Sequence, residues 1–150
     1  MKIKKAAIED LETAAKLFDL YRQFYKQPSD IVSAKKFLSE RIGKNESVIF
    51  IATEEVENTG MGFVQLYPSF SSVSMERILI LNDLFVHEDH RKQGIAEALI
   101  NESKKYSLKT NSKGIILETH STNMNAQRLY DKIGFKKDDE HFRYYLEVKE

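Results

Sequence analysis

The sequence of 150 residues contains no cysteine. This absence excludes disulfides, thiolate nucleophiles and zinc sites built on cysteine ligands. It also excludes acyl transfer through a thioester on the protein. An acyl group handled by this chain would have to pass directly to its acceptor or through a different nucleophile.

The sequence also lacks an excess of charge of either sign, because 23 lysine and arginine residues balance 23 acidic ones. Without a net positive charge, no overall field attracts phosphate backbones or anionic lipid. The basic start at residues 1–5 is followed by Glu9 and Asp10 before any apolar run of signal-peptide or membrane-spanning length. We therefore expect no nucleic-acid or membrane partner, and a cytoplasmic location.

The length and the absence of repeats or low-complexity linkers predict one domain spanning residues 1–150. Apolar periodicity predicts helices at residues 10–27, 30–42, 94–108 and 125–133. It predicts strands at residues 3–8, 48–52, 61–67, 78–86 and 115–119, and further strands around Phe135 and over 142–148. A strand–helix–strand order over 78–119 predicts two parallel strands joined by a crossover. The expected fold class is mixed α/β.

An anion site is predicted where the apolar strand at 78–86 gives way to a helix, over residues 87–96, HEDHRKQGIA. The first turn of a helix presents amides that have no intrahelical acceptor, at the positive end of the helix dipole. Gly94 and Ala96 are small enough for a phosphate to approach the backbone, and Arg91 and Lys92 add positive charge. The alternative is that Gly94 only admits the helix and the two cations are solvated loop charges.

Two motifs carry a resemblance to a known family. The first is Leu81–Val86 followed by Arg91-x-x-Gly94-x-Ala96, and the second is the run NMNAQRLYDKIGF at residues 123–135. At this separation they resemble the two motifs of the GNAT superfamily of N-acetyltransferases, over about residues 1–147. Ala96 stands where many members have glycine, and it is still small. The resemblance implies a GNAT-like mixed central β-sheet, splayed at the cofactor site and flanked by about four helices.

The resemblance further implies acetyl-CoA as cosubstrate. Backbone groups of Leu84, Phe85 and Val86 would pair with its pantetheine arm, which needs a splayed sheet with a bulge near Asn82–Asp83. The pyrophosphate would be bound by the amides of Arg91, Lys92, Gln93, Gly94, Ile95 and Ala96. Asn123 would contact the cofactor from the other side, and its alternative role is a helix cap.

Acetyl transfer to an amine needs an acceptor for the amine proton and a donor for the leaving thiolate. Tyr130 matches the family position of the donor; the alternative is a core aromatic. Asp83 and Glu118, followed closely by His120, are the candidate bases. The alternatives are a structural carboxylate for Asp83 and a solvent-facing charge for Glu118. No metal site is expected, because His87 and neighbouring residues lack the HExxH spacing and acyl transfer needs no metal.

The predicted function is that of an acetyl-CoA-dependent N-acetyltransferase that acts on a primary amine by direct transfer. The strand sequence NDLFV at residues 82–86 is similar to that of polyamine and histone-type acetyltransferases, so small polyamines and other small cationic amines are the first acceptors to test. Two alternatives stay open: a non-catalytic acyl-CoA-binding sensor, and an acetyltransferase acting on a protein amine. A homodimer is compatible with either.

Aromatic and acidic side chains suited to a cationic amine fall where the family builds its acceptor site. They are Tyr21, Phe24, Tyr25, Asp30, Tyr67 and Phe70. These residues would equally suit the edge of a core.

Overall fold

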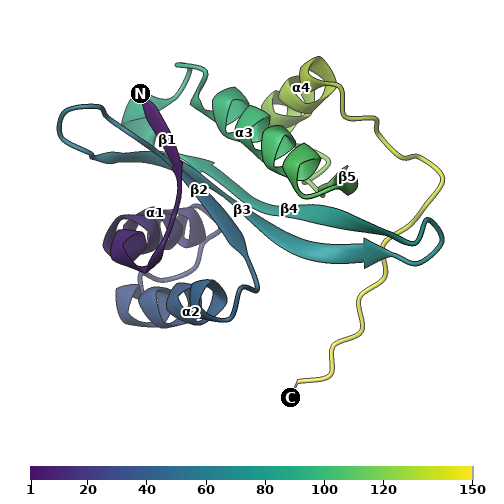
Figure 1. Cartoon of the computed structure of the whole chain (residues 1–150), viewed down its shortest axis with the longest axis horizontal. Coiled ribbons are helices and arrows are strands. Elements are labelled where there is room, and N and C mark those ends of the chain that lie inside the picture. The colour runs from purple at the N-terminus through teal and green to yellow at the C-terminus, as the bar shows by residue number, and fades with distance from the viewer. Residues whose placement is uncertain (150) are drawn as a thin grey trace. The chain divides into compact units, whose positions relative to one another are not determined.

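A computed structural model describes residues 1–149 of the chain (Figure 1). Its contacts divide the chain into two units, Met1–Glu118 and Thr119–Glu150. The first unit contains a β-sheet and three α-helices, and the second contains the fourth α-helix. Within residues 1–149, no helix has both the length and the apolar composition needed to cross a membrane.

The first unit is built on a five-stranded mixed sheet with the strand order β1-β2-β3-β4-β5. The strands are β1 (Lys2–Lys5), β2 (Val48–Thr53), β3 (Gly60–Ser71), β4 (Glu76–Val86) and β5 (Ser112–Ile116). Neighbours along the chain from β1 to β4 pair antiparallel, whereas β4 and β5 pair parallel. The mixed α/β class and the predicted parallel pair are therefore confirmed.

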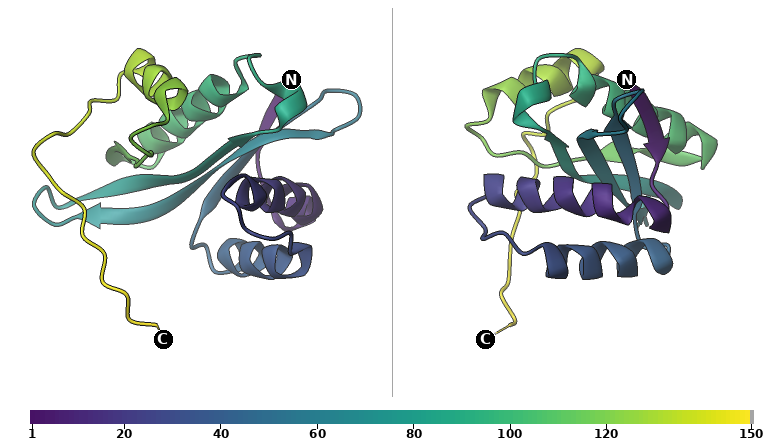
Figure 2. Two further views of the ribbon diagram at one scale, coloured as in Figure 1. Left: turned by 180° about the vertical axis from the view of Figure 1, so that it is seen from behind. Right: turned by 90° about the vertical axis from the view of Figure 1, so that its left-hand side faces the viewer.

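Helices cover both faces of this sheet. Helices α1 (Leu11–Phe24) and α2 (Ile31–Gly43) lie on one face, and α3 (Ile95–Lys109) lies on the other (Figures 1 and 2). Helix α2 begins after Asp30, whose carboxylate accepts a hydrogen bond from the amide of Ser33 at 3.1 Å. The short 3₁₀ helices η1 (Ile8–Asp10) and η2 (Glu88–His90) connect strands to helices.

The main core lies between the sheet and the pair α1–α2. Its largest fully buried members include Phe63, Leu38 and Ile51. Burying an aliphatic or phenyl side chain of this size contributes about 1.5–3 kcal/mol each. Strand β2 is buried along all six of its residues, so both of its faces are covered. This core includes Phe63 of β3 and Phe85 of β4, which β3 and β4 direct toward α1.

The predicted first strand is longer than the observed one, because the chain turns earlier. Strand β1 ends at Lys5, and Ile8 belongs to η1. The carboxylate of Asp10 accepts a hydrogen bond from the amide of Ala7 at 3.0 Å. It also forms an ion pair with the ammonium group of Lys4 at 2.5 Å. These local bonds stabilise the turn in place of further strand pairing.

In the second unit, α4 (Met124–Ile133) has a defined start and a defined end. The side-chain oxygen of Asn123 accepts a hydrogen bond from the amide of Ala126 at 3.3 Å. Gly134 ends the helix in the left-handed conformation, with φ of 111°. Both features agree with the predicted helix.

The strands predicted around Phe135 and over residues 142–148 are not formed. From Phe135 to Lys149 the chain has neither helix nor strand and runs as an extended segment (yellow in Figure 1). A strand needs a neighbour that accepts and donates its backbone hydrogen bonds, and no strand of the described chain pairs with this segment. Residues 142–148 have the alternating pattern of a strand, but within the described chain no other strand pairs with them.

Candidate active site

Strand β4 pairs with β3 on one side and with β5 on the other, and the two ladders differ in length. Its ladder with β3 continues to Val86, whereas its ladder with β5 ends at Ile80, opposite Ile116. Beyond Ile80 the two parallel strands part, which confirms the predicted splay. Residues 84–86 therefore lie where β4, in the part of the chain described, has a strand on one side only.

A bulge lies at the point of this splay. Gln65 faces Asp83, but the next residue of β3, Leu66, faces Leu81, so Asn82 is an extra residue on β4. This confirms the predicted bulge. Because the extra residue reverses the alternation, Leu81 and Asp83 point to opposite faces of the sheet. Asp83 is thereby directed to the face that α1 covers.

Asp83 is buried, with 4% of its surface exposed, and its carboxylate has three side-chain partners. Gln65 Nε2 donates to Oδ2 at 2.5 Å, Asn82 Nδ2 donates to Oδ1 at 3.1 Å, and the hydroxyl of Tyr21 is the third donor. Burial raises the pKa of the Asp83 carboxyl, and the three hydrogen bonds lower it by less. A carboxylate with increased proton affinity in a buried position is what a general base requires.

Two tyrosines lie in the field of this carboxylate. Burial, followed by the charge of Asp83, raises the pKa of Tyr21 above its usual range and the pKa of Tyr67 to about 12. Both hydroxyls therefore stay protonated at neutral pH and remain hydrogen-bond donors. The ring of Tyr21 is held edge-on against Phe63 and Phe85, with centroids 5.7 and 6.4 Å apart.

The loop before α3 has the backbone geometry that an anion site needs. Gly94 lies in the left-handed region with φ of 78°, and a Cβ placed on it would meet no atom within 4 Å. The first helical hydrogen bond runs from the amide of Ala98 to the carbonyl of Gly94 at 3.0 Å. The amides of Ile95 and Ala96 thus come before the helical ladder begins. Open space beside these amides fits a phosphate group.

Arg91 connects this loop to the end of β4. Its Nε donates to the carbonyl of Val86 at 3.2 Å, and its guanidinium lies over the ring of Phe24 with 5.6 Å to the centroid. The carbonyl of Val86, one of the groups predicted to face pantetheine, is therefore bonded to Arg91 in this structure. Lys92 and Gln93 are exposed, and Lys92 has φ of 61°.

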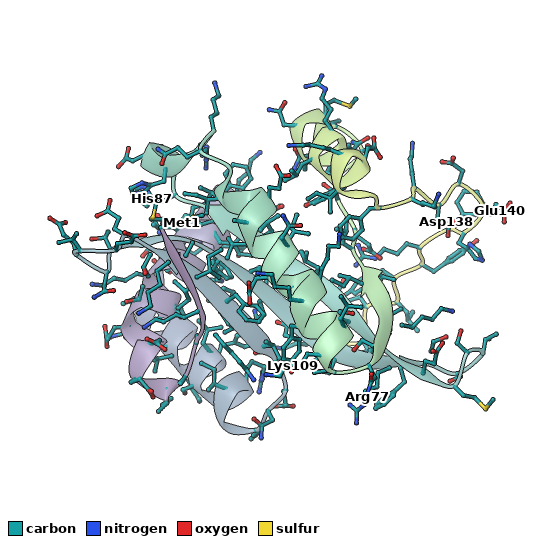
Figure 3. The ribbon with its side chains drawn as sticks, turned by 45° about the horizontal axis from the view of Figure 1, so that its top comes forward. Met1, Arg77, His87, Lys109, Asp138 and Glu140 are labelled. Atoms are coloured by element: carbon teal, nitrogen blue, oxygen red, sulfur yellow. The ribbon has the colours of Figure 1, made fainter. Side chains whose placement is uncertain are left out.

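His87 lies beside the start of α3, and Lys109 lies at the other end of this helix (Figure 3). His87 Nδ1 accepts a hydrogen bond from the amide of Asp89 at 3.3 Å, so the ring caps η2. Among residues 1–149, no three histidine or acidic side chains form a group that could hold a metal ion.

The comparisons with known proteins agree with this geometry. The family model described as "Acetyltransferase (GNAT) family" matches residues 14–135, which is most of the chain. The chain belongs to the GNAT family of acetyltransferases. The uncharacterized N-acetyltransferase YhfO of Bacillus subtilis is 43% identical over 148 residues, which cover 99% of this chain and 98% of YhfO.

Further relatives agree. A probable acetyltransferase of Haemophilus influenzae is 35% identical, over 91% of this chain and 90% of its own length. The crystal structure of a probable acetyltransferase with 40% identity superposes with a TM-score of 0.94 over 100% of this chain and 99% of its own. This chain is therefore an N-acetyltransferase with the GNAT fold.

The predicted site residues of this acetyltransferase fall in both units. Asp83 and residues 84–96 lie in the first unit, at the splay of β4 and at the start of α3. Asn123 and Tyr130 lie in the second, where Asn123 caps α4 and the ring of Tyr130 packs against Phe135 with centroids 5.6 Å apart.

Glu118 does not lie on a strand, as had been expected from a strand over residues 115–119. Strand β5 ends at Ile116, because its ladder with β4 ends there as the two strands diverge. Glu118 follows two residues later, exposed to solvent. It is therefore exposed where Asp83 is buried.

The candidate acceptor residues are also separated by the structure. Tyr21 and Tyr67 lie near Asp83, whereas Asp30 caps α2. Phe24 and Phe70 lie under guanidinium groups, at 5.6 and 5.5 Å. Tyr25 packs edge-on against Tyr21 with centroids 5.0 Å apart. Gln65, the closest partner of Asp83, was not predicted, although it is the one amide among the apolar residues 61–66.

Proposed function

We propose that this GNAT enzyme takes the acetyl group of acetyl-CoA and transfers it directly to a primary amine, with a polyamine or another small cationic amine as the acceptor. The observation that carries the proposal is the buried carboxylate of Asp83 at the splay of β4, shortly before the loop over residues 87–94 that leads into α3. A splayed strand, a proton acceptor and an anion-binding loop then follow one another along a short stretch of chain.

Acetyl-CoA would be held mainly by backbone groups, with Arg91 and Lys92 adding positive charge beside the pyrophosphate. Residues 84–86 of β4 would bond the pantetheine arm as a neighbouring strand does. The amides of residues 91–96 would bond the pyrophosphate, with Asn123 as a further contact. The open space at Gly94 supports this assignment, because a side chain there would occupy the room that a phosphate needs.

In the reaction, the amine nitrogen forms a bond to the thioester carbonyl carbon, and the carbon–sulfur bond breaks. The amine must lose a proton, because an ammonium of pKa about 10.4 needs roughly 4–5 kcal/mol to become neutral at pH 7. Asp83, directly or through water, accepts this proton. Tyr130 donates a proton to the leaving thiolate, since a phenol of pKa near 10 is protonated at neutral pH.

The surroundings of Asp83 favour a cationic acceptor. A carboxylate with two tyrosine rings nearby attracts an ammonium group by charge and by cation–π interaction. Gln65 Oε1, a buried acceptor beside Asp83, has no hydrogen-bond partner within the described chain, and an N–H donor of the amine would satisfy it. A protein amine and a sensor without catalysis are the two other possibilities, and the cytoplasmic location remains a prediction.

An assay of free thiol tests the proposal with little background. The protein contains no cysteine, so a thiol reagent reports only the CoA released. The purified chain is incubated with acetyl-CoA and, in separate reactions, polyamines, other small amines and peptides with a free N-terminus. We expect thiol release with a cationic small amine and a matching acetylated product by mass spectrometry.

Two outcomes would contradict the proposal. Release with peptides only would move the acceptor to a protein amine. Binding of acetyl-CoA without release for any amine would favour the sensor. The Asp83→Asn variant, assayed in parallel, separates enzymatic release from spontaneous hydrolysis.

A further inference from the structure

The carbonyl of Val86 points to the open side of β4. Within a trans peptide group the C=O and the N–H point in opposite directions, and the amide of His87 donates to the carbonyl of Met61 on β3 at 2.8 Å. The Val86 carbonyl of the same peptide group therefore faces away from β3, on the side where β5 has parted from β4. A cosubstrate that adds to β4 as a strand does would need this carbonyl.

Arg91 occupies this place. Its Nε donates to the Val86 carbonyl at 3.2 Å, so part of the guanidinium lies on the open side of the strand. None of the ion pairs formed within residues 1–149 includes Arg91. Its cationic group therefore bonds a neutral carbonyl, and a phosphate oxygen would be a stronger acceptor for it.

The ring of Phe24 holds Arg91 in this position. The guanidinium carbon lies 5.6 Å from the centroid of the ring, within the range of a cation–π contact. Although Phe24 is 59% exposed, its ring packs edge-on against Tyr25 with centroids 5.4 Å apart. Tyr25 packs edge-on against Tyr21 at 5.0 Å, and Tyr21 bonds Asp83. A chain of aromatic contacts thus connects the ring under Arg91 to the buried carboxylate.

We propose that Arg91 closes the cosubstrate slot beside Val86 until acetyl-CoA arrives, and that Phe24 is the positioning residue that keeps it closed. This role rests on the proposed function, in which acetyl-CoA lies along β4. When acetyl-CoA binds, the guanidinium leaves the carbonyl and the ring and turns to the pyrophosphate. The carbonyl is then free for the pantetheine arm. The affinity of wild type is accordingly reduced in proportion to the fraction of molecules in which the slot is open.

Isothermal titration calorimetry of the full-length protein with acetyl-CoA tests this role. Phe24→Leu removes the ring but keeps an apolar side chain, so it should loosen Arg91. The affinity for acetyl-CoA should then increase by roughly 2- to 5-fold, the equilibrium factor of one exposed cation–π contact. Phe24→Tyr keeps a ring under the guanidinium and should bind as wild type does. A ring that only supported the fold would not weaken cosubstrate binding, so its loss would bring no gain in affinity.

Phe37→Leu is the matched control. The ring of Phe37 on α2 lies under the guanidinium of Arg41 at 4.7 Å, so this variant loses the same kind of contact elsewhere. It should bind acetyl-CoA with wild-type affinity. A double-mutant comparison separates the release of Arg91 from a direct effect of Phe24. In an Arg91→Gln background, Phe24→Leu should change the affinity no further, because the group that the ring holds is gone.

Three outcomes would contradict this role of Arg91 and Phe24. Binding by wild type, combined with an unchanged or weaker affinity in Phe24→Leu, would overturn it and leave the proposed function in place. A gain in affinity that persists in the Arg91→Gln background would also overturn it, because Arg91 would then not be the group that closes the slot. No binding of millimolar acetyl-CoA by wild type or by Phe24→Leu would contradict the proposed function as well.

Discussion

Gln65 on β3 donates a hydrogen bond to the carboxylate of Asp83 on β4 over 2.5 Å, and the two residues are 0% and 4% exposed. The bulge at Asn82 sets this contact, because it turns Asp83 to the α1 face directly opposite Gln65. A buried carboxylate is costly unless it is bonded or has a function. The amide of Gln65 supplies the bond, and the raised pKa of Asp83 supplies a reason for a function.

Asp83→Asn should leave acetyl-CoA binding intact and lower kcat/KM by roughly 10²–10⁴-fold, the usual contribution of a positioned base. The loss should be greatest at low pH and should recover partly at high pH, where more of the acceptor amine is already neutral. The measurement is kcat/KM between about pH 6 and 9.5 for both proteins. Parallel profiles together with a lowered melting temperature would move the base to Glu118, His120 or water.

Gln65→Leu should displace the acid side of the pH profile to higher pH. The hydrogen bond from Gln65 lowers the pKa of Asp83, so its removal lets burial raise that pKa further. The variant should therefore need a higher pH to reach the same fraction of its maximal rate. Ser103→Ala is the matched control, because the buried Ser103 hydroxyl bonds the carbonyl of Leu99 on α3. A profile that keeps its position in Gln65→Leu would show that Gln65 does not tune the base.

The stability of Asp83→Asn relative to wild type should increase with pH. The pKa of Asp83 is raised in the folded state, so the folded protein binds the proton more tightly than the unfolded chain. Wild-type stability from this group is fully present below the ordinary pKa of 3.8 and is lost as pH rises through the folded value. Asparagine has no such loss. Melting temperatures of both proteins at acidic and at mildly alkaline pH measure the difference. A melting temperature of Asp83→Asn minus that of wild type that stays constant or falls as pH rises would contradict this assignment.

Acetyl-CoA should stabilise the folded protein, by about 2.7 kcal/mol at a concentration about a hundred times its Kd. Gly94→Glu should abolish this thermal shift, because it places a carboxylate in the open space beside the amides that precede α3. Gly94→Asn adds no charge and tolerates the left-handed backbone, so it should retain part of the shift. Gly43→Glu, a control at the end of α2, should keep all of it. No shift for wild type at millimolar acetyl-CoA would falsify the proposed cosubstrate.

Tyr130→Phe should keep the affinity for acetyl-CoA and lower kcat by roughly 10²–10⁴-fold. Phenylalanine preserves the ring that packs against Phe135 and removes only the hydroxyl that donates the proton. Phe135→Leu is the control for ring packing. It should lower the melting temperature and should reduce kcat much less than Tyr130→Phe does. Wild-type turnover by Tyr130→Phe would mean that Tyr130 is a core aromatic.

The features that the sequence by itself determined are local ones. Asp30 and Asn123 each cap a helix by bonding an amide three residues later, and Gly134 ends α4 because it accepts a positive φ. Gly94 marks the start of α3 for the same reason. Such bonds and torsions join residues within one turn, so residue type and spacing are sufficient to predict them.

The features that only the tertiary structure decided depend on which strand lies beside which. Gln65 and Asp83 are 18 residues apart, and their contact requires one pairing register and one bulge. Glu118 lies beyond β5 because the ladder with β4 ends at Ile116. The alternating pattern at residues 142–148 predicts a strand, but a strand forms only where another edge accepts its hydrogen bonds. A pattern in one segment cannot specify that partner, because the partner's edge is set by chain that lies far away in sequence.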